Sequence, residues 1–148
     1  LSTLKSRCIE FKINISFNKS INISNLLINN NVFELINYDL ISYYDTPGQI
    51  INLLNFSNEK KINLKEYKLK DLLTLLVDNG FYKKNKFVKE LLIKFIELYF
   101  LKEFNRTTEK NTLLSFYHTF LNKIKNTEKF NLDEESLFLE FKSKLLNG

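Results

Sequence analysis

The chain is poor in the residues that build disulfide scaffolds, zinc sites and phosphate-binding loops. Its 148 residues include no alanine, methionine or tryptophan, one proline, one histidine and one cysteine, Cys8, which has no partner for an internal disulfide. The three glycines, Gly48, Gly80 and Gly148, are too far apart to form a phosphate-binding loop. One histidine and one cysteine cannot complete a closed zinc shell. We therefore expect no metal and no cofactor.

Long uncharged apolar runs are also missing. The most apolar long stretch, 87–104, is interrupted by six charged residues, so no transmembrane helix is expected. At the same time 44% of the residues are hydrophobic, which is far too many for a disordered tail. The length fits a single domain, 1–148, with a continuous core.

The composition points to an AT-rich genome. Twenty asparagines and twenty lysines stand beside two arginines and no alanine, so residues with GC-rich codons are depleted together. Organelle genomes, reduced endosymbionts, AT-rich protists and AT-rich viruses share this bias. The chain begins at Leu1 rather than Met, as expected of a chain whose leader is removed or of a piece of a longer protein.

The N-terminal segment 1–24 has a strand-like pattern. Residues 9–17 alternate apolar and polar side chains at every step, and 21–24 repeats the alternation and could pair with it. A hairpin of two strands is marginal alone, so this segment is expected to lean on helices or on a partner's sheet.

The remainder, 25–148, is predicted to be helical. Ser24 could cap a first helix, and an apolar series continues through 32–41. Thr46-Pro47 is a helix start signal, and Asn79-Gly80 is a stop signal. Further helices are expected over 64–78 and 86–104, from Thr107 or Thr108 onward, and from a capping-box-like Asn131 to Leu145. Short loops between them predict antiparallel hairpins, arranged as an irregular bundle or a short α-solenoid. The predicted fold is mainly α with a short β-like N-terminal segment.

One predicted hairpin carries a family resemblance. The segment 69–95 reads LKDLLTLLVDNGFYKKNKFVKELLIKF: a leucine-rich helix, a glycine followed by an aromatic, and a second helix that begins near a phenylalanine. This resembles the hairpin of heptatricopeptide and octotricopeptide repeat proteins, although alanines are missing at the close helix contacts. Members of that group act on organellar RNA or belong to mitochondrial ribosomes, so the resemblance implies organellar RNA biology.

The positive charge is concentrated in the middle third. Residues 58–106 contain twelve basic and seven acidic side chains, whereas both flanks are balanced, and this accounts for the net charge of +5. RNA phosphates would be bound here first, and two tyrosines are available either to stack on bases or to cap the core. The alternative is a solvated lysine face in a lysine-biased protein. The candidate RNA-binding residues are Lys60, Lys61, Lys65, Lys68, Lys70, Lys83, Lys84, Lys86, Lys89, Tyr67 and Tyr82.

Catalysis is not indicated. His118 lies in an aromatic helical stretch, and nothing places it beside Cys8 as a nucleophile and base pair. The acidic residues 133–135 suit the first turn of a helix. We therefore expect a protein that is not an enzyme and has no small-molecule substrate.

Aromatic side chains are abundant, with fourteen phenylalanines and seven tyrosines. The helix over 86–104 is apolar on nearly all sides, so it is either the central helix or buried in an assembly. Under the second alternative the partner contacts are Phe95, Ile96, Tyr99 and Phe100.

Two functional hypotheses follow. The first is a non-catalytic structural subunit of a large organellar assembly, such as a mitochondrial ribosome or an RNA-processing complex, with other subunits and RNA as partners. The second is a helical protein-interaction module, such as an accessory subunit of a respiratory or ATP synthase complex or a viral protein that binds a host partner.

Overall fold

The computed structural model describes residues 15–83, 85–130 and 133–146, which are mainly helical and contain no strand. The mainly α prediction is therefore confirmed for these residues. The helices are α2 (Phe17–Ile28), α3 (Val32–Leu35), α4 (Pro47–Lys60), α5 (Leu69–Asp78), α6 (Lys86–Arg106), α7 (Lys110–Phe130) and α8 (Glu135–Phe141). Short 3-10 turns η1 (Tyr38–Leu40) and η2 (Phe81–Lys83) and a π-helical turn η3 (Lys142–Leu146) complete the order.

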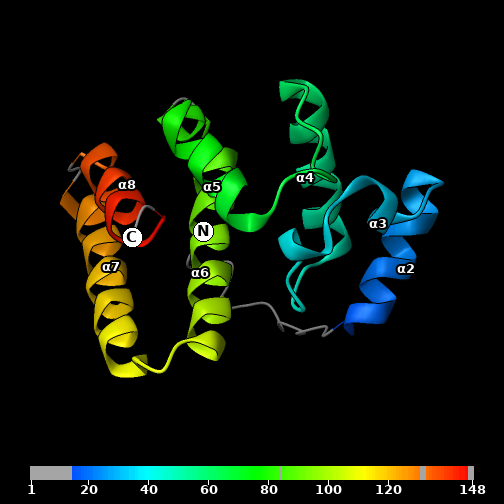
Figure 1. Ribbon diagram of the computed structural model, residues 1–148. Helices are drawn as coiled ribbons and strands as arrows, with labels where there is room; N and C mark the ends of the chain where they lie inside the picture. Colours follow the sequence, from blue (N-terminus) through cyan, green and yellow to red (C-terminus); the bar gives the residue numbers. More distant parts are fainter. Residues whose placement is uncertain (1–14, 84, 131–132, 147–148) are drawn as a thin grey trace, which may run out of the picture.

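The helices lie side by side in a row. Figure 1 shows α7 and α8 at one end, α5 and α6 in the middle, then α4, and α2 with α3 at the other end. From α5 to α8 successive helices alternate in direction, and α6 contacts both α5 and α7 (Figure 1). These are antiparallel hairpins.

Local signals explain where α4 begins and α5 ends. The Thr46 hydroxyl accepts a hydrogen bond from the Gln49 amide, and the Gln49 side chain accepts one from the Thr46 amide, which makes a capping box before Pro47. After α5, Gly80 has φ of +58°, a left-handed conformation that disfavours other residues. The predicted start at Pro47 and stop at Asn79-Gly80 are confirmed.

The strand prediction for 21–24 is wrong, because these residues lie within α2. Ser20 and Ser24 are one turn apart on the buried face of this helix, where Ser24 Oγ donates to the Ser20 carbonyl at 2.8 Å and Ser20 Oγ donates to the Asp45 carbonyl at 2.5 Å. The buried face of α2 combines Ser20, Ile21 and Ser24, while Ile23 is 38% exposed, so the alternation over 21–24 does not follow burial. Ser24 is therefore inside a helix, not a cap. Residues 1–14, which hold most of the strand predicted over 9–17, lie outside the described part.

Three helix predictions need adjustment. The apolar series over 32–41 forms α3 and η1 rather than one helix, because the Asn37 side chain accepts from the Asp39 amide and starts a new turn. The last helix begins at Glu135, and the capping residue predicted at Asn131 lies outside the described residues. The helix predicted over 64–78 is shorter in the structure, since α5 begins at Leu69, five residues after Leu64.

The core is centred on α6. Its buried residues cover slightly more than half of the helix circumference: Val88, Leu91, Leu92, Phe95, Ile96, Leu98, Tyr99 and Phe100. Helices α5 and α7 and the C-terminal turn cover them, and Tyr99 Oη donates to the Leu145 carbonyl at 2.8 Å. Of the two explanations for an all-apolar helix, the central position within this chain is the one observed. None of the helices described here combines the length and the apolar character needed to cross a bilayer.

Candidate nucleic-acid interface

Carboxylates neutralise four of the lysines predicted to bind RNA. Lys83 Nζ lies 2.6 Å from Glu135, and Lys89 pairs with Glu134, so α8 covers the positive charge at the start of α6. Lys60 Nζ lies 2.6 Å from Glu59, and Lys86 Nζ lies 3.9 Å from Glu90. Lys84 lies outside the described residues. The start of α6 is therefore a weaker phosphate site than the sequence indicates.

The other four lysines form the basic strip, defined here as Lys61, Lys65, Lys68 and Lys70. They lie along the connection from α4 to α5 and on the first turn of α5, and all four are exposed. Lys65 Nζ donates to the Phe33 carbonyl at 2.6 Å, which anchors its side chain but leaves its charge unpaired. None of the four has a carboxylate partner among the described residues, so the strip keeps its positive charge.

Beside the strip is a polar hollow of about 570 Å³. Four cations and two carboxylates line it, so its walls carry a net positive charge: Lys68, Lys70, Lys102, Arg106, Asp39 and Glu103. Sequence reasoning did not select Lys102 and Arg106, because they are more than thirty residues from the strip and only folding brings α6 beside the start of α5.

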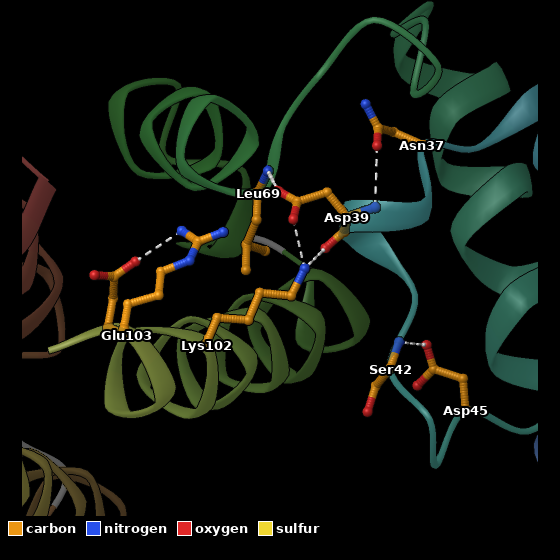
Figure 2. A network of polar contacts seen from close by, with 8 residues as sticks. Asn37, Asp39, Ser42, Asp45, Leu69, Lys102 and Glu103 are labelled. Carbon is orange, nitrogen blue, oxygen red and sulfur yellow. Dashed lines mark hydrogen bonds and ion pairs between the residues drawn. The ribbon is translucent and has the colours of Figure 1, made fainter.

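Asp39 forms hydrogen bonds with two other residues that line this hollow, as Figure 2 shows. Its carboxylate accepts from the Leu69 amide at 2.7 Å and from Lys102 Nζ at 2.5 Å. Burial works to raise the pKa of Asp39, but the hydrogen bonds from Lys102 and Leu69 and the charges of Lys102 and Arg106 outweigh it and hold the pKa below its usual value. Asp39 already binds Lys102, and Glu103 lies 3.2 Å from Arg106 Nη1, so a bound anion would meet Lys68 and Lys70 first.

The two tyrosines predicted to stack on bases differ in exposure. Tyr82 is only 5% exposed, and its ring packs edge-on against Phe138 with centroids 4.7 Å apart. Its stacking role is therefore wrong, because the ring belongs to the core. Tyr67 is half-buried, packs against the core and lies between Lys65 and Lys68 in the strip. It is the remaining aromatic candidate for a base.

The predicted partner contacts are also in the core. Phe95 and Ile96 are 0% exposed, Phe100 is 4% exposed and Tyr99 is 9% exposed. The Phe100 ring lies within 6.1 Å, centroid to centroid, of rings on both α7 and α8. These four residues cannot present a surface to a partner, so that prediction is corrected.

Exposed apolar side chains lie elsewhere. On α2, Leu26 is 76% exposed, Leu27 is 62% exposed and Ile23 is 38% exposed. On α6 and α7, Leu101 and Leu114 are 52% and 39% exposed. Sequence reasoning missed the face of α2 because it treated apolar residues as buried, whereas serines occupy the buried side of this helix.

Side chains that could hold a metal ion do not cluster in the part of the chain that the structure describes. No group of three histidine, cysteine, aspartate or glutamate side chains is close enough there to hold an ion. His118 is exposed on α7, and its ring is near Tyr117 with centroids 6.2 Å apart. Cys8 lies outside the described residues. The exposed lysines of the basic strip can bind anions.

Comparison of the chain with models of known protein families, with curated proteins and with solved structures finds no match. The resemblance of 69–95 to heptatricopeptide and octotricopeptide repeats stays a prediction.

Proposed function

We propose that this chain is a non-catalytic structural subunit of a large organellar assembly, a mitochondrial ribosome or an RNA-processing complex, and that it binds RNA phosphates with the basic strip. The observation that supports the proposal is that Lys61, Lys65, Lys68 and Lys70 have no carboxylate partner in the part of the chain that the structure describes, while Lys86 and Lys89 on α6 have one each. The organellar location rests on the AT-rich composition and on the repeat-like hairpin. No bound small molecule is needed for this role.

The strip suits a backbone ligand rather than a base-specific one. Lysine ammonium groups contact phosphates as point charges, without the planar fork that reads a guanine edge. Arg106 lies across the hollow, but its guanidinium pairs with Glu103 at 3.2 Å, so its fork is already engaged. Tyr67 can add a sequence-tolerant stacking contact. Binding should therefore be strongly dependent on salt and weakly dependent on RNA sequence.

The test is fluorescence anisotropy with a labelled single-stranded RNA of about 16 nucleotides. Four lysine contacts predict that the logarithm of the association constant falls with the logarithm of salt concentration with a slope of about −3. In a variant that carries Lys61→Gln, Lys65→Gln, Lys68→Gln and Lys70→Gln together, we expect affinity to fall by about tenfold or more at low salt and the slope to approach zero.

A matched control removes the same charge elsewhere. Lys19, Lys110, Lys125 and Lys129 also lack a carboxylate partner among the described residues, and they lie on α2 and α7. The variant with these four changed to Gln has the same net charge as the strip variant. If both variants lose affinity equally, the binding is an effect of total charge and the strip is not an RNA site.

A specific observation favours the second candidate, a helical protein-interaction module. The exposed leucines of α2 stand at the end of the row, where a short α-solenoid would continue into a further helix (Figure 1). Such a module could be an accessory subunit of a respiratory or ATP synthase complex, or a viral protein that binds a host partner. Sedimentation of the tagged protein from its own cells distinguishes the two: nuclease disperses a ribonucleoprotein particle and leaves a protein complex intact.

A further inference from the structure

An apolar groove runs between α6 and α7, away from the basic strip. Its volume is about 220 Å³, larger than the ~150 Å³ apolar cavity known to hold a benzene-sized group. Phe100 is buried beneath it, whereas Leu101 on α6 and Leu114 on α7 are exposed along it. The groove therefore has room for at least one apolar side chain and presents one exposed leucine from each helix.

Glu97 is the charged residue that lines the groove among the described residues. Its carboxylate has no hydrogen bond or ion pair there, and the apolar surroundings raise its pKa through desolvation. Burial of Tyr117 is the main cause that raises the pKa of its hydroxyl, and the negative charge of Glu97 raises this pKa further. Glu97 is exposed at the edge of this apolar groove, and an unpaired carboxylate there favours an occupant that combines apolar groups with a cation.

Helix α2 carries that combination on its exposed face. Lys19, Ile23, Leu26 and Leu27 have the i, i+4, i+7, i+8 spacing of one helical face. Lys19 is exposed and has no carboxylate partner among the described residues, and Leu26 is 76% exposed. Here one helix presents an apolar stripe that begins with an unpaired cation.

The two surfaces cannot meet within one molecule. Figure 1 places α2 at one end of the row and α7 at the other. We propose that α2 of one copy of this chain docks into the α6–α7 groove of a second copy, with Lys19 paired to Glu97. The contact joins two different surfaces, so it is head-to-tail, and each bound copy leaves one groove and one α2 face free for another.

Other occupants fit the groove less well. The Glu97 carboxylate repels an RNA phosphate or an anionic lipid headgroup, and no cation of the described residues lines the groove to offset it. A helix laid in a groove is an established recognition mode for apolar residues at this spacing. The contact area is that of one short helix face, so association is expected at the weak end of protein interfaces, with dissociation constants above about 1 μM.

The test is sedimentation of the full chain after nuclease treatment, over concentrations up to about 1 mM. We expect the average mass to rise with concentration beyond that of a dimer. Leu26→Gln and Leu114→Gln should each lower the association constant by about tenfold or more, because each places an amide in the contact. The matched control is Leu139→Gln, which changes a leucine of α8 that is 47% exposed and should have no effect.

A mixture of two variants tests whether the contact is head-to-tail. The Leu26→Gln variant keeps an intact groove and the Leu114→Gln variant keeps an intact α2, so an equimolar mixture should form a one-to-one dimer that neither forms alone. Lys19→Glu should weaken association by about tenfold, and Lys19→Glu combined with Glu97→Lys should restore it. A chain that stays monomeric, a mixture that does not associate, or no rescue by the charge exchange overturns the proposal. Nuclease treatment removes RNA from the assay, so failure here leaves the RNA-binding proposal to its own test.

Discussion

Replacing Asp39 with asparagine tests how the middle of the row is held together. Asp39 belongs to η1, and its carboxylate accepts from the first amide of α5, at Leu69, and from Lys102 of α6 (Figure 2). One side chain thus joins three segments that are 30 and 63 residues apart in the sequence. Asparagine has nearly the same shape but one acceptor oxygen and no charge, so Asp39→Asn loses one of the two hydrogen bonds and removes the charge that strengthens the contact with Lys102.

The magnitude follows from the two hydrogen bonds. Removing an acceptor from the first turn of a helix costs about 1 kcal/mol. A charge-assisted hydrogen bond is worth more than this when buried, but the side chains of Asp39 and Lys102 are 31% and 25% exposed, and solvent screening reduces the loss to about 1 kcal/mol. The free energy of unfolding should therefore fall by about 2 kcal/mol. For a chain of this length, that lowers Tm by about 4–8 °C.

The assay is urea unfolding followed by far-UV circular dichroism, with Asp71→Asn as the control. Asp71 is an exposed acid in the first turn of the same helix, so its replacement should cost only about 0.3 kcal/mol through the helix dipole. A double-mutant cycle with Lys102→Met should show a coupling energy of about 1 kcal/mol. A loss below about 0.5 kcal/mol for Asp39→Asn, or equal losses at both sites, would refute the reasoning.

Three further predictions concern the core, pH and the RNA surface. Leu92→Ala should lower the free energy of unfolding by about 3 kcal/mol, and Leu139→Ala by less than about 1 kcal/mol, because Leu92 is 0% exposed and Leu139 is 47% exposed; urea unfolding measures both. The lowered pKa of Asp39 stabilises the fold above its unfolded pKa, so the stability difference from Asp39→Asn should be constant at pH 5–7 and shrink below about pH 4 in urea titrations. Tyr82→Phe should leave RNA affinity within about twofold by anisotropy, since the ring is buried.

Local signals made part of the fold predictable. Thr46-Pro47 and Asn79-Gly80 act through their own backbone geometry, so the ends they mark are where the sequence predicts them. The face of α2 was not predictable in this way. Whether a serine is buried depends on the neighbouring helix, and here the Asp45 carbonyl from the next loop satisfies the Ser20 hydroxyl. Periodicity cannot reveal an acceptor that is 25 residues away.

The same limit applies to the candidate site. The sequence correctly locates an excess of lysines in 58–106, but it cannot show which of them acquire carboxylate partners. Lys83 and Lys89 meet Glu135 and Glu134 across 52 and 45 residues, because α8 folds back over the start of α6. Burial of Tyr82 has the same origin, since Phe138 of α8 covers its ring. Long-range packing therefore decides which lysines remain unpaired at the surface. The composition gives only the largest number of lysines that can be unpaired.

The basic strip and the head-to-tail contact use different parts of the row, so one chain can use both at once. The strip lies at the α4–α5 connection, whereas the contact uses α2 and the α6–α7 groove (Figure 1). Copies joined head to tail would therefore present one strip each along a continuous RNA, and every bound copy would recruit its neighbour through Leu26 and Glu97. On an RNA long enough for several copies, binding should be cooperative.

The cooperativity of RNA binding distinguishes the role of the basic strip from the role of the head-to-tail contact. Leu26→Gln should make binding to a long RNA non-cooperative while leaving the affinity for an RNA of about 16 nucleotides unchanged, because the strip is intact. The strip variant should lose affinity for both RNAs, yet still associate with itself in the absence of RNA. Titration of both RNAs with both variants measures each effect. Equal cooperativity in the wild type and in Leu26→Gln would mean that neighbours on the RNA do not touch through α2, and that the strip acts alone.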